Sequence, residues 1–272
     1  MSERLANLSW QSVLVIVAVL LCIRFLLMRV QGDFAKSIAE IAESLAVAMA
    51  LVFFLIRPFL VQAFFIPSGS MHPTLLEDDH ILVNKLGYRF FQPRTGDVVV
   101  FKAPPDASED GEEKDYIKRL IATPGDTVEI RGAVFKVGAE RKTRQEVFTE
   151  LSSPRDIVEE PRVKYLANGV LLNGRLLPKE RVAQAFDVKP ADLTIYPGKT
   201  ILNGKVLDEP YTAEDPDYDL PRTKIDDGYL LVLGDNRNNS NDGHRWGPLE
   251  RKRLLGKAMF IFWPLNRVRI VD

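Results

Sequence analysis

The chain changes character over one stretch, Phe64-Phe65-Ile66-Pro67-Ser68-Gly69-Ser70-Met71-His72-Pro73-Thr74-Leu75, where a long apolar segment gives way to polar sequence. Two prolines and a glycine surround the serines, so the backbone is predicted to bend here rather than continue as a regular helix or strand. Such a bend can present a serine hydroxyl as a nucleophile. The alternative is a plain linker between a membrane segment and a folded domain, and Ser-Gly-Ser alone would favour the linker.

Two apolar segments lie before and into this bend, at 10–29 and 45–66. Each holds about 20 residues, and at 1.5 Å rise per residue a helix of that length crosses a hydrocarbon core of about 30 Å. We therefore predict two transmembrane helices, preceded by a tail at 1–9 and joined by a cytoplasmic connector at 30–44. The first segment could instead be a cleavable targeting peptide, but its apolar run is long and it ends without a small-x-small cleavage site.

Basic residues favour one orientation of the two helices. They are Arg4 in the tail, Arg29 and Lys36 in or beside the connector, and Arg24, whose side chain can extend to the connector side. Because cytoplasmic loops carry more Lys and Arg, the domain after Ile66 is predicted to lie on the outer or periplasmic side of the plasma membrane. The pair Arg57-Pro58 is expected to mark the outer interface of the second helix.

Composition argues against several classes of site. A net charge of −1 and a pI near 6.4 argue against a nucleic-acid surface. The single cysteine, Cys22, lies in the first apolar segment, which excludes an intrachain disulfide and a thiol nucleophile outside the membrane. The three histidines form no metal-binding pair by spacing, so neither a metal nor another cofactor is expected.

The part of the chain after the bend is predicted to be mainly β and antiparallel. Short β-rich runs separated by turn residues occur at 80–85, 97–101, 116–122, 127–130, 229–233, 257–262 and 267–271. Two similar segments, 171–177 and 201–207, each suggest a hairpin built on Asn-Gly. Residues 132–199 are more charged and less regular, and they are expected to be an insertion with a weaker core signal.

Lys118 is the base that the sequence offers to a serine nucleophile. On a strand, Tyr116, Lys118 and Leu120 would share one face, so the lysine would lie among apolar side chains. A free lysine has a pKa of about 10.4 and is protonated at neutral pH, but burial can lower that pKa by up to about 3 to 5 units. A buried Lys118 could therefore accept the serine proton. From this segment alone, a Lys-Arg pair on a solvated strand edge would be the more ordinary interpretation.

A third segment, Gly234 to Gly247, is dense in Asp, Asn, Arg and Ser. Such side chains stabilise turns locally, which predicts an elaborate loop. The alternative is that the loop braces a Ser/Lys dyad.

Taken together, the segments resemble those of one enzyme family in the same order along the chain. They are the serine run at 64–75, Tyr116-Ile117-Lys118-Arg119-x-x-x-x-Pro124-Gly125-Asp126, Gly234-Asp235-Asn236-Arg237-x-Asn239-Ser240-x-Asp242, and the less distinctive run from Phe91 to Phe101. The chain resembles type I signal peptidases of the S26 family, which are membrane-bound serine proteases that remove signal peptides from exported proteins. The resemblance covers the second apolar segment and most of the β domain, but not the insertion at 132–199.

The resemblance implies a role for each matching residue. Ser70 would be the nucleophile, a neutral Lys118 its general base, and Ser240 the group that orients the lysine amine. The Ser70 N–H and the Ser68 hydroxyl would form an oxyanion hole, in which each donor can lower the barrier by roughly 2.7 to 4 kcal/mol. The implied substrate-binding residues are Phe64, Ile66, Pro67, Met71, Leu75, Tyr116 and Ile117, and the implied structural braces are Arg119, Asp235, Arg237 and Asp242. The implied partners are secretory pre-proteins and a lipid bilayer.

One departure and two other functions stay open. Asp242-Gly243-His244 stands where many family members have Asp-Ser-Arg, so an Asp–Arg pair would become an Asp–His pair whose strength depends on pH. The chain could also be a non-catalytic, membrane-anchored β domain that binds signal-bearing or unfolded chains. A specialised Ser/Lys peptidase for pilin or conjugation substrates is equally compatible with the motifs. Self-cleaving repressor-type proteins are disfavoured, because the chain has two membrane-length segments and no DNA-binding segment.

Overall fold

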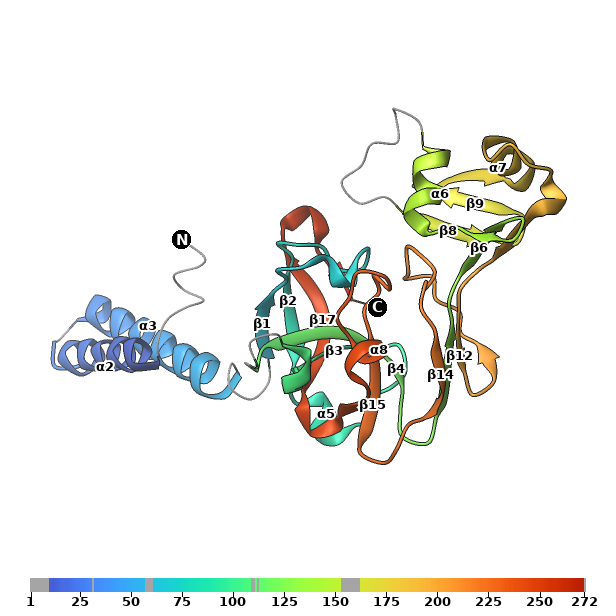
Figure 1. Cartoon of the computed structure of the whole chain (residues 1–272). Coiled ribbons are helices and arrows are strands. Elements are labelled where there is room, and N and C mark those ends of the chain that lie inside the picture. Colours follow the sequence, from blue (N-terminus) through green and yellow to red (C-terminus); the bar gives the residue numbers. More distant parts are fainter. Residues whose placement is uncertain are drawn as a thin grey trace. The chain divides into compact units, whose positions relative to one another are not determined.

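The computed structural model describes residues 10–30, 32–56, 61–108, 111, 113–152 and 162–271. These residues form two compact units, one dominated by the N-terminal helices and one made of the β-rich part from Phe64 onward (Figure 1). The tail at 1–9 and the pair Arg57-Pro58 lie outside the described residues, so what was expected of them stays a prediction.

The N-terminal unit holds helix α2 (Trp10–Leu27) and helix α3 (Asp33–Ala50), which continues into a wider π-helical turn, η1 (Leu51–Ile56). Arg24 of α2 forms an ion pair with Glu43 of α3, with 2.7 Å between Nε and Oε2. Within the described residues, one helix is long enough and apolar enough to cross a membrane, and it covers Asp33–Phe54. A shorter apolar helix covers Gln11–Leu27.

The second helix differs from its predicted bounds at both ends. Helix α3 begins at Asp33 rather than at Leu45, and Val61–Phe65, expected as the end of a helix, is strand β1. The charged residues of α3 recur every three or four positions: Asp33, Lys36, Glu40 and Glu43. At this spacing they occupy one side of a helix, so they interrupt the apolar run without ending the helix.

The larger unit is built on an antiparallel sheet, as the sequence predicted. In spatial order its strands are β1, β2 (His80–Asn84), β17 (Leu254–Trp263), β3 (Val98–Lys102), β4 (Asp115–Ala122), β15 (Tyr229–Leu233) and β16 (Leu249–Glu250), with β18 (Arg269–Ile270) paired to β17. The predicted strands are confirmed within a few residues, except that the last is shorter than expected. The pairing of Val99 with Lys118 in the β3–β4 register holds Lys118 in the middle of the sheet.

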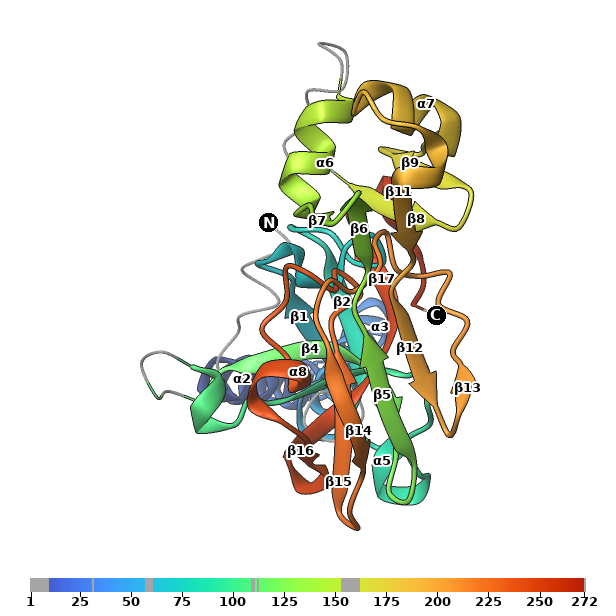
Figure 2. The same cartoon turned by 45° about the vertical axis from the view of Figure 1, so that its right-hand side comes forward.

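A second sheet follows the order β13 (Lys205–Val206), β12 (Lys199–Leu202), β5 (Thr127–Arg131) and β14 (Leu220–Lys224), and Figure 2 shows β12, β5 and β14 side by side. The predicted hairpin at 201–207 is present, with Asn203 and Gly204 at φ angles of 52° and 79°. Positive φ at both central residues is what a tight two-residue hairpin needs, and Asn-Gly supplies it at low cost.

Short helical turns join these strands. They are η2 (Gly69–Met71), α5 (Gly87–Phe90), η3 (Pro105–Ala107), α8 (Gly243–Trp246), η5 (Arg251–Arg253) and η6 (Leu265–Arg267). The first of these carries Ser70, so the predicted bend is a single helical turn between β1 and β2.

Residues 132–199, here called the insert, have a hydrophobic core of their own, contrary to the weak core signal expected. The elements of the insert are β6 (Val134–Val137), β7 (Glu140–Arg141), α6 (Arg144–Leu151), β8 (Val163–Leu166), β9 (Gly169–Leu172), β10 (Arg175–Pro178), α7 (Lys179–Ala185), η4 (Pro190–Asp192) and β11 (Leu193–Tyr196). Figure 1 shows α6, α7, β8 and β9 gathered together. Buried side chains between them include Phe135, Tyr165, Leu172 and Val182. The other predicted Asn-Gly hairpin joins β9 to β10. Each of these elements is short and contributes few consecutive apolar residues. The sequence pattern therefore did not indicate the core.

Phe135→Ala is expected to lower the free energy of unfolding of the insert by about 3 to 5 kcal/mol, because it leaves a cavity in a closed core. Phe135 is 1% exposed, and its ring lies 5.3 Å from that of Phe186 and 5.7 Å from that of Tyr165. Urea unfolding followed by limited proteolysis measures the effect. Tyr196→Ala, at a side chain 63% exposed in the same subdomain, is the control and should cost less than about 1 kcal/mol. Equal effects in the two variants would contradict an independent insert core.

Candidate active site

Ser70 lies on the turn η2 between two apolar anchors. Ile66 before it and Met71 after it are buried in the same hydrophobic cluster, at 2% and 0% exposure, while Ser70 itself stays partly exposed. The turn is therefore fixed on both sides and still presents its hydroxyl. Ser68, just before the turn, is exposed in an extended conformation with φ of −144°.

Asn236 holds the backbone of the serine turn. Its N–H donates to the Ser70 carbonyl at 3.1 Å, and its side-chain Nδ2 donates to the Gly69 carbonyl at 3.0 Å. Asn236 belongs to the motif at 234–242 but was not among the predicted site residues. Asn side chains often form hydrogen bonds to backbone groups, so the high Asn content of this loop was the sequence feature that could have indicated the role of Asn236.

Lys118 reaches this turn from strand β4. Its Nζ lies 2.8 Å from Ser70 Oγ and donates to the Ile117 carbonyl at 2.8 Å. The side chain is 4% exposed, unlike a lysine on a solvated edge. Burial lowers the pKa of Lys118 to about 8, although the negative charges of Asp242 and Asp235 act in the opposite direction. A substantial fraction of this amine is therefore neutral near physiological pH.

Arg119, the next residue, faces the other way and pairs with a carboxylate. Its Nε and Nη2 donate to the two carboxylate oxygens of Asp235 at 2.8 and 2.7 Å. Thr74 donates to the same carboxylate at 2.5 Å, and Arg119 Nη1 donates to the Gly96 carbonyl at 2.8 Å. Arg119 and Asp235 are 2% and 0% exposed, so this is a buried, bidentate pair. Thr74 was not among the predicted site residues.

Arg237 makes a second buried pair. Its two terminal nitrogens donate to Glu209 at 2.8 and 2.5 Å, and Nη1 also donates to Thr200 at 2.9 Å. Burial raises the pKa of Glu209, but the hydrogen bonds and charge of Arg237 outweigh it and leave that pKa below its ordinary value. The loop at 234–242 is thereby joined to β12 and the segment after it. Glu209 carried no motif and was missed.

Asp242 pairs with His244, which stands where the resemblance led us to expect an arginine. One Asp242 oxygen accepts the Gly234 N–H at 2.8 Å, and the other lies 2.7 Å from His244 Nδ1. Burial raises the pKa of Asp242, but the His244 and Gly234 hydrogen bonds hold it below its ordinary value. The His244 ring stacks on the Tyr218 ring, with 3.9 Å between centroids, so the phenol supports one face of the imidazole.

Gly234 lets Ser240 approach the serine turn. A Cβ at position 234 would lie 2.3 Å from Ser240 Oγ and 2.5 Å from the Ser70 carbonyl oxygen, so only glycine fits between them. The Ser240 hydroxyl is buried, and it helps to hold the pKa of Asp242 below its ordinary value. Its implied role in orienting Lys118 stays a prediction.

The implied substrate-binding residues divide by exposure. Ile66, Met71 and Leu75 are at most 2% exposed and support the turn from behind, so in this structure they offer no surface to a peptide. Phe64, Tyr116 and Ile117 are only partly buried, and Pro67 is exposed. The implied substrate-binding role of these four stays a prediction. Among the described residues, no three His, Cys, Asp or Glu side chains are grouped to hold a metal ion.

Comparison with known proteins places these residues in a family context. A family model described as "Signal peptidase, peptidase S26" matches residues 38–263. A probable signal peptidase I-2 of Synechocystis is 33% identical over 233 residues, covering 85% of this chain and 76% of that protein. Signal peptidase I of Aquifex aeolicus is 30% identical over 237 residues, covering 82% of this chain and 83% of that protein. A probable thylakoidal processing peptidase 2 of Arabidopsis thaliana is 29% identical and is matched over 43% of its own length.

Asp235→Ala is expected to lower the free energy of unfolding by about 3 to 5 kcal/mol, because it leaves the Arg119 guanidinium buried without its partner. Chemical denaturation of the detergent-solubilised full chain measures the change. Glu140→Ala, which removes a partner from the exposed Glu140–Lys142 pair, is the control and should change stability by less than about 1 kcal/mol. A small effect at Asp235 would mean that the buried pair does not hold the site together.

Proposed function

This chain belongs to the signal peptidase family, peptidase S26, and from that premise we propose that it is a serine endopeptidase that removes signal peptides from exported pre-proteins. The single observation that carries the proposal is the 2.8 Å separation of Ser70 Oγ and Lys118 Nζ, with the lysine buried. A serine hydroxyl needs a base within hydrogen-bond reach, and this amine is the group that meets it.

The reaction would begin with proton transfer from Ser70 to the neutral amine of Lys118. Ser70 Oγ then attacks the carbonyl carbon of the scissile peptide bond, and the electron pair of the carbonyl moves to its oxygen. When the tetrahedral intermediate collapses, the C–N bond breaks, Lys118 returns its proton to the leaving amine, and the signal peptide stays on Ser70 as an ester. Lys118 then takes a proton from a water molecule whose oxygen attacks the ester carbonyl carbon. The bond from that carbon to Ser70 Oγ breaks, Lys118 returns the proton to Ser70 Oγ, and the signal peptide leaves with a free carboxyl group.

The developing negative charge on the carbonyl oxygen needs donors near Ser70. We assign this role to the Ser70 N–H and the Ser68 hydroxyl, which the resemblance implies. The exposure of Ser68 beside the turn is compatible with a hydroxyl that engages only when substrate is bound. Each such donor contributes about 2.7 to 4 kcal/mol to lowering the barrier. The hydrogen bonds from Asn236 to the carbonyls of residues 69 and 70 would keep the turn from rotating as charge develops.

Apolar side chains support a substrate path that ends at the membrane. Phe64, Tyr116 and Ile117 border the turn and would contact the small residues that precede the cleavage point. On strands β1, β17 and β18 of the same sheet, the large apolar side chains Phe65, Trp263 and Ile270 are half or more exposed. Such a surface fits contact with lipid. We propose that α2 and α3 are both membrane-spanning and that the β domain lies on the outer face.

Ser70→Ala and Lys118→Ala are each expected to lower kcat for pre-protein cleavage by about 10³-fold or more, since either change removes a member of the dyad. Gel-based cleavage of a labelled pre-protein by the detergent-solubilised chain measures the loss, and circular dichroism checks that the variants fold. Lys205→Ala, at an exposed lysine of β13, is the matched control and should retain activity. Stoichiometric pre-protein binding without a shortened product in the wild type would instead favour the non-catalytic binder.

The pH dependence of cleavage should follow Lys118. Because only the neutral amine accepts the Ser70 proton, and because burial brings its pKa to about 8, kcat/KM is expected to rise as the pH increases through about 8 and to level off above it. A pH–rate profile between pH 6 and 10 with a neutral substrate measures this. A rate that is constant across the range, or that rises only above pH 10, would contradict a lysine base of lowered pKa.

A further inference from the structure

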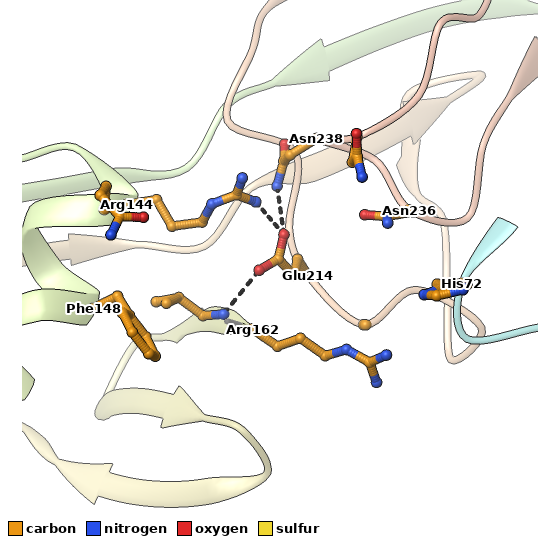
Figure 3. Close-up of a pocket in the computed structure, with 11 residues that line it drawn as sticks. His72, Arg144, Phe148, Arg162, Glu214, Asn236 and Asn238 are labelled. Carbon is orange, nitrogen blue, oxygen red and sulfur yellow. Dashed lines mark hydrogen bonds and ion pairs between the residues drawn. The ribbon is translucent and has the colours of Figure 1, made fainter. Parts of the chain in front are cut away.

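A polar pocket of about 260 Å³ lies between the insert and the loops of the active site. Figure 3 shows Arg144, Phe148 and Arg162 of the insert on one side and His72, Asn236 and Asn238 on the other. We call this cavity, together with the residues that line it, the insert pocket. None of the lining residues belongs to the Ser70–Lys118 dyad or is one of the braces described above.

The pocket has a fixed wall centred on the buried carboxylate of Glu214. Glu214 accepts hydrogen bonds from the Arg144 guanidinium, from the Val163 N–H at 2.9 Å and from Asn238 Nδ2 at 3.2 Å. Asn238 also donates to the Asp215 carbonyl at 2.9 Å. Because Asn238 belongs to the same loop as Asp235 and Asn236, Glu214 links the insert to the loop that holds the serine turn.

The insert pocket carries a surplus of positive charge. Glu214 balances Arg144, and His72 Nε2 lies 2.5 Å from Glu77. The Arg162 guanidinium has no ion-pair partner among the residues that the structure describes, and in Figure 3 it extends toward His72 rather than toward Glu214. A guanidinium beside side-chain amides is suited to a carboxylate, and Phe148 adds an apolar surface that a side chain, unlike a small inorganic anion, can contact.

The position of the pocket indicates which part of a substrate would reach it. His72 follows Ser70 by two residues, and Asn236 contacts the carbonyls of the serine turn, so the pocket adjoins the nucleophile on the side of the 234–242 loop. The apolar side chains assigned to the residues before the cleavage point lie on β1 and β4 instead. A peptide that fills those positions and continues past Ser70 would leave over the insert pocket.

We propose that the insert pocket binds an acidic side chain of the substrate within the first few residues after the cleavage point, with Arg162 as its ion-pair partner. This inference rests on the proposed function and deepens it, because it gives the insert a role in choosing among pre-proteins. The insert then binds the start of the mature chain, while Phe64, Tyr116 and Ile117 contact the end of the signal peptide.

The test compares three pre-proteins that differ only at the second and third residues after the cleavage point. Both residues are Glu in the first substrate, Gln in the second and Lys in the third. With the full chain in detergent at low salt, kcat/KM should be about fivefold higher for the Glu substrate than for the Lys substrate, the size expected of a partly exposed ion pair. Arg162→Gln should remove the preference and Arg162→Glu should reverse it, and high salt should weaken it. Arg181→Glu, an equal charge change at an exposed residue of α7 outside the pocket, is the control and should leave the ratio unchanged.

The outcomes separate the two proposals. Cleavage of all three pre-proteins at equal rates by the wild type, or the same change of ratio in Arg162→Glu and Arg181→Glu, would overturn the insert pocket alone. If the wild type cuts none of them, the proposed function fails and this inference fails with it. Thermal unfolding of each variant checks that Arg162 acts through charge and not through loss of the insert fold.

Discussion

The buried ion pair between Arg119 and Asp235 is the constraint on which the site depends. It joins strand β4, which carries Lys118, to the loop after β15, and Thr74 joins the serine segment to the same carboxylate. Three stretches of chain far apart in sequence therefore meet at one charge pair. Removing one partner of such a pair generally costs more than its net worth, since the other charge stays buried. The Arg237–Glu209 pair is a second buried ion pair, and it joins the same loop to the segment after β12.

Lys118 and Arg119 are adjacent on β4 but lie in different electrostatic environments. Arg119 has a bidentate carboxylate and a backbone carbonyl, so its charge is compensated. Lys118 has a hydroxyl and one carbonyl, with the carboxylates of Asp235 and Asp242 acting only at a distance. Desolvation therefore outweighs attraction at Lys118 and lowers its pKa. The alternation of a β strand is what separates the two environments within one residue.

Much of the β domain could be predicted because its strands are short, alternating and bounded by turn residues, and the positions of Ser70 and Lys118 followed from motif and strand register. The bounds of α3 could not be predicted from hydropathy, since its charged residues lie on one side of the helix. The core of the insert was hidden because it is assembled from many short elements. Thr74, Glu209 and Asn236 were missed because each acts through a partner distant in sequence, and no local pattern marks such a contact. The burial of Met71 and Leu75 likewise depends on packing that a motif does not contain.

The proposed chemistry depends on Lys118 as a buried amine of lowered pKa in contact with Ser70. The most direct measurement is an NMR titration of the lysine side-chain carbon next to Nζ in the detergent-solubilised chain, with the Lys118 signal assigned by its loss in Lys118→Arg. We expect the Lys118 signal to titrate near pH 8, separate from the signals of the remaining lysines. A Lys118 signal that titrates with the exposed lysines, above about pH 10, would contradict it.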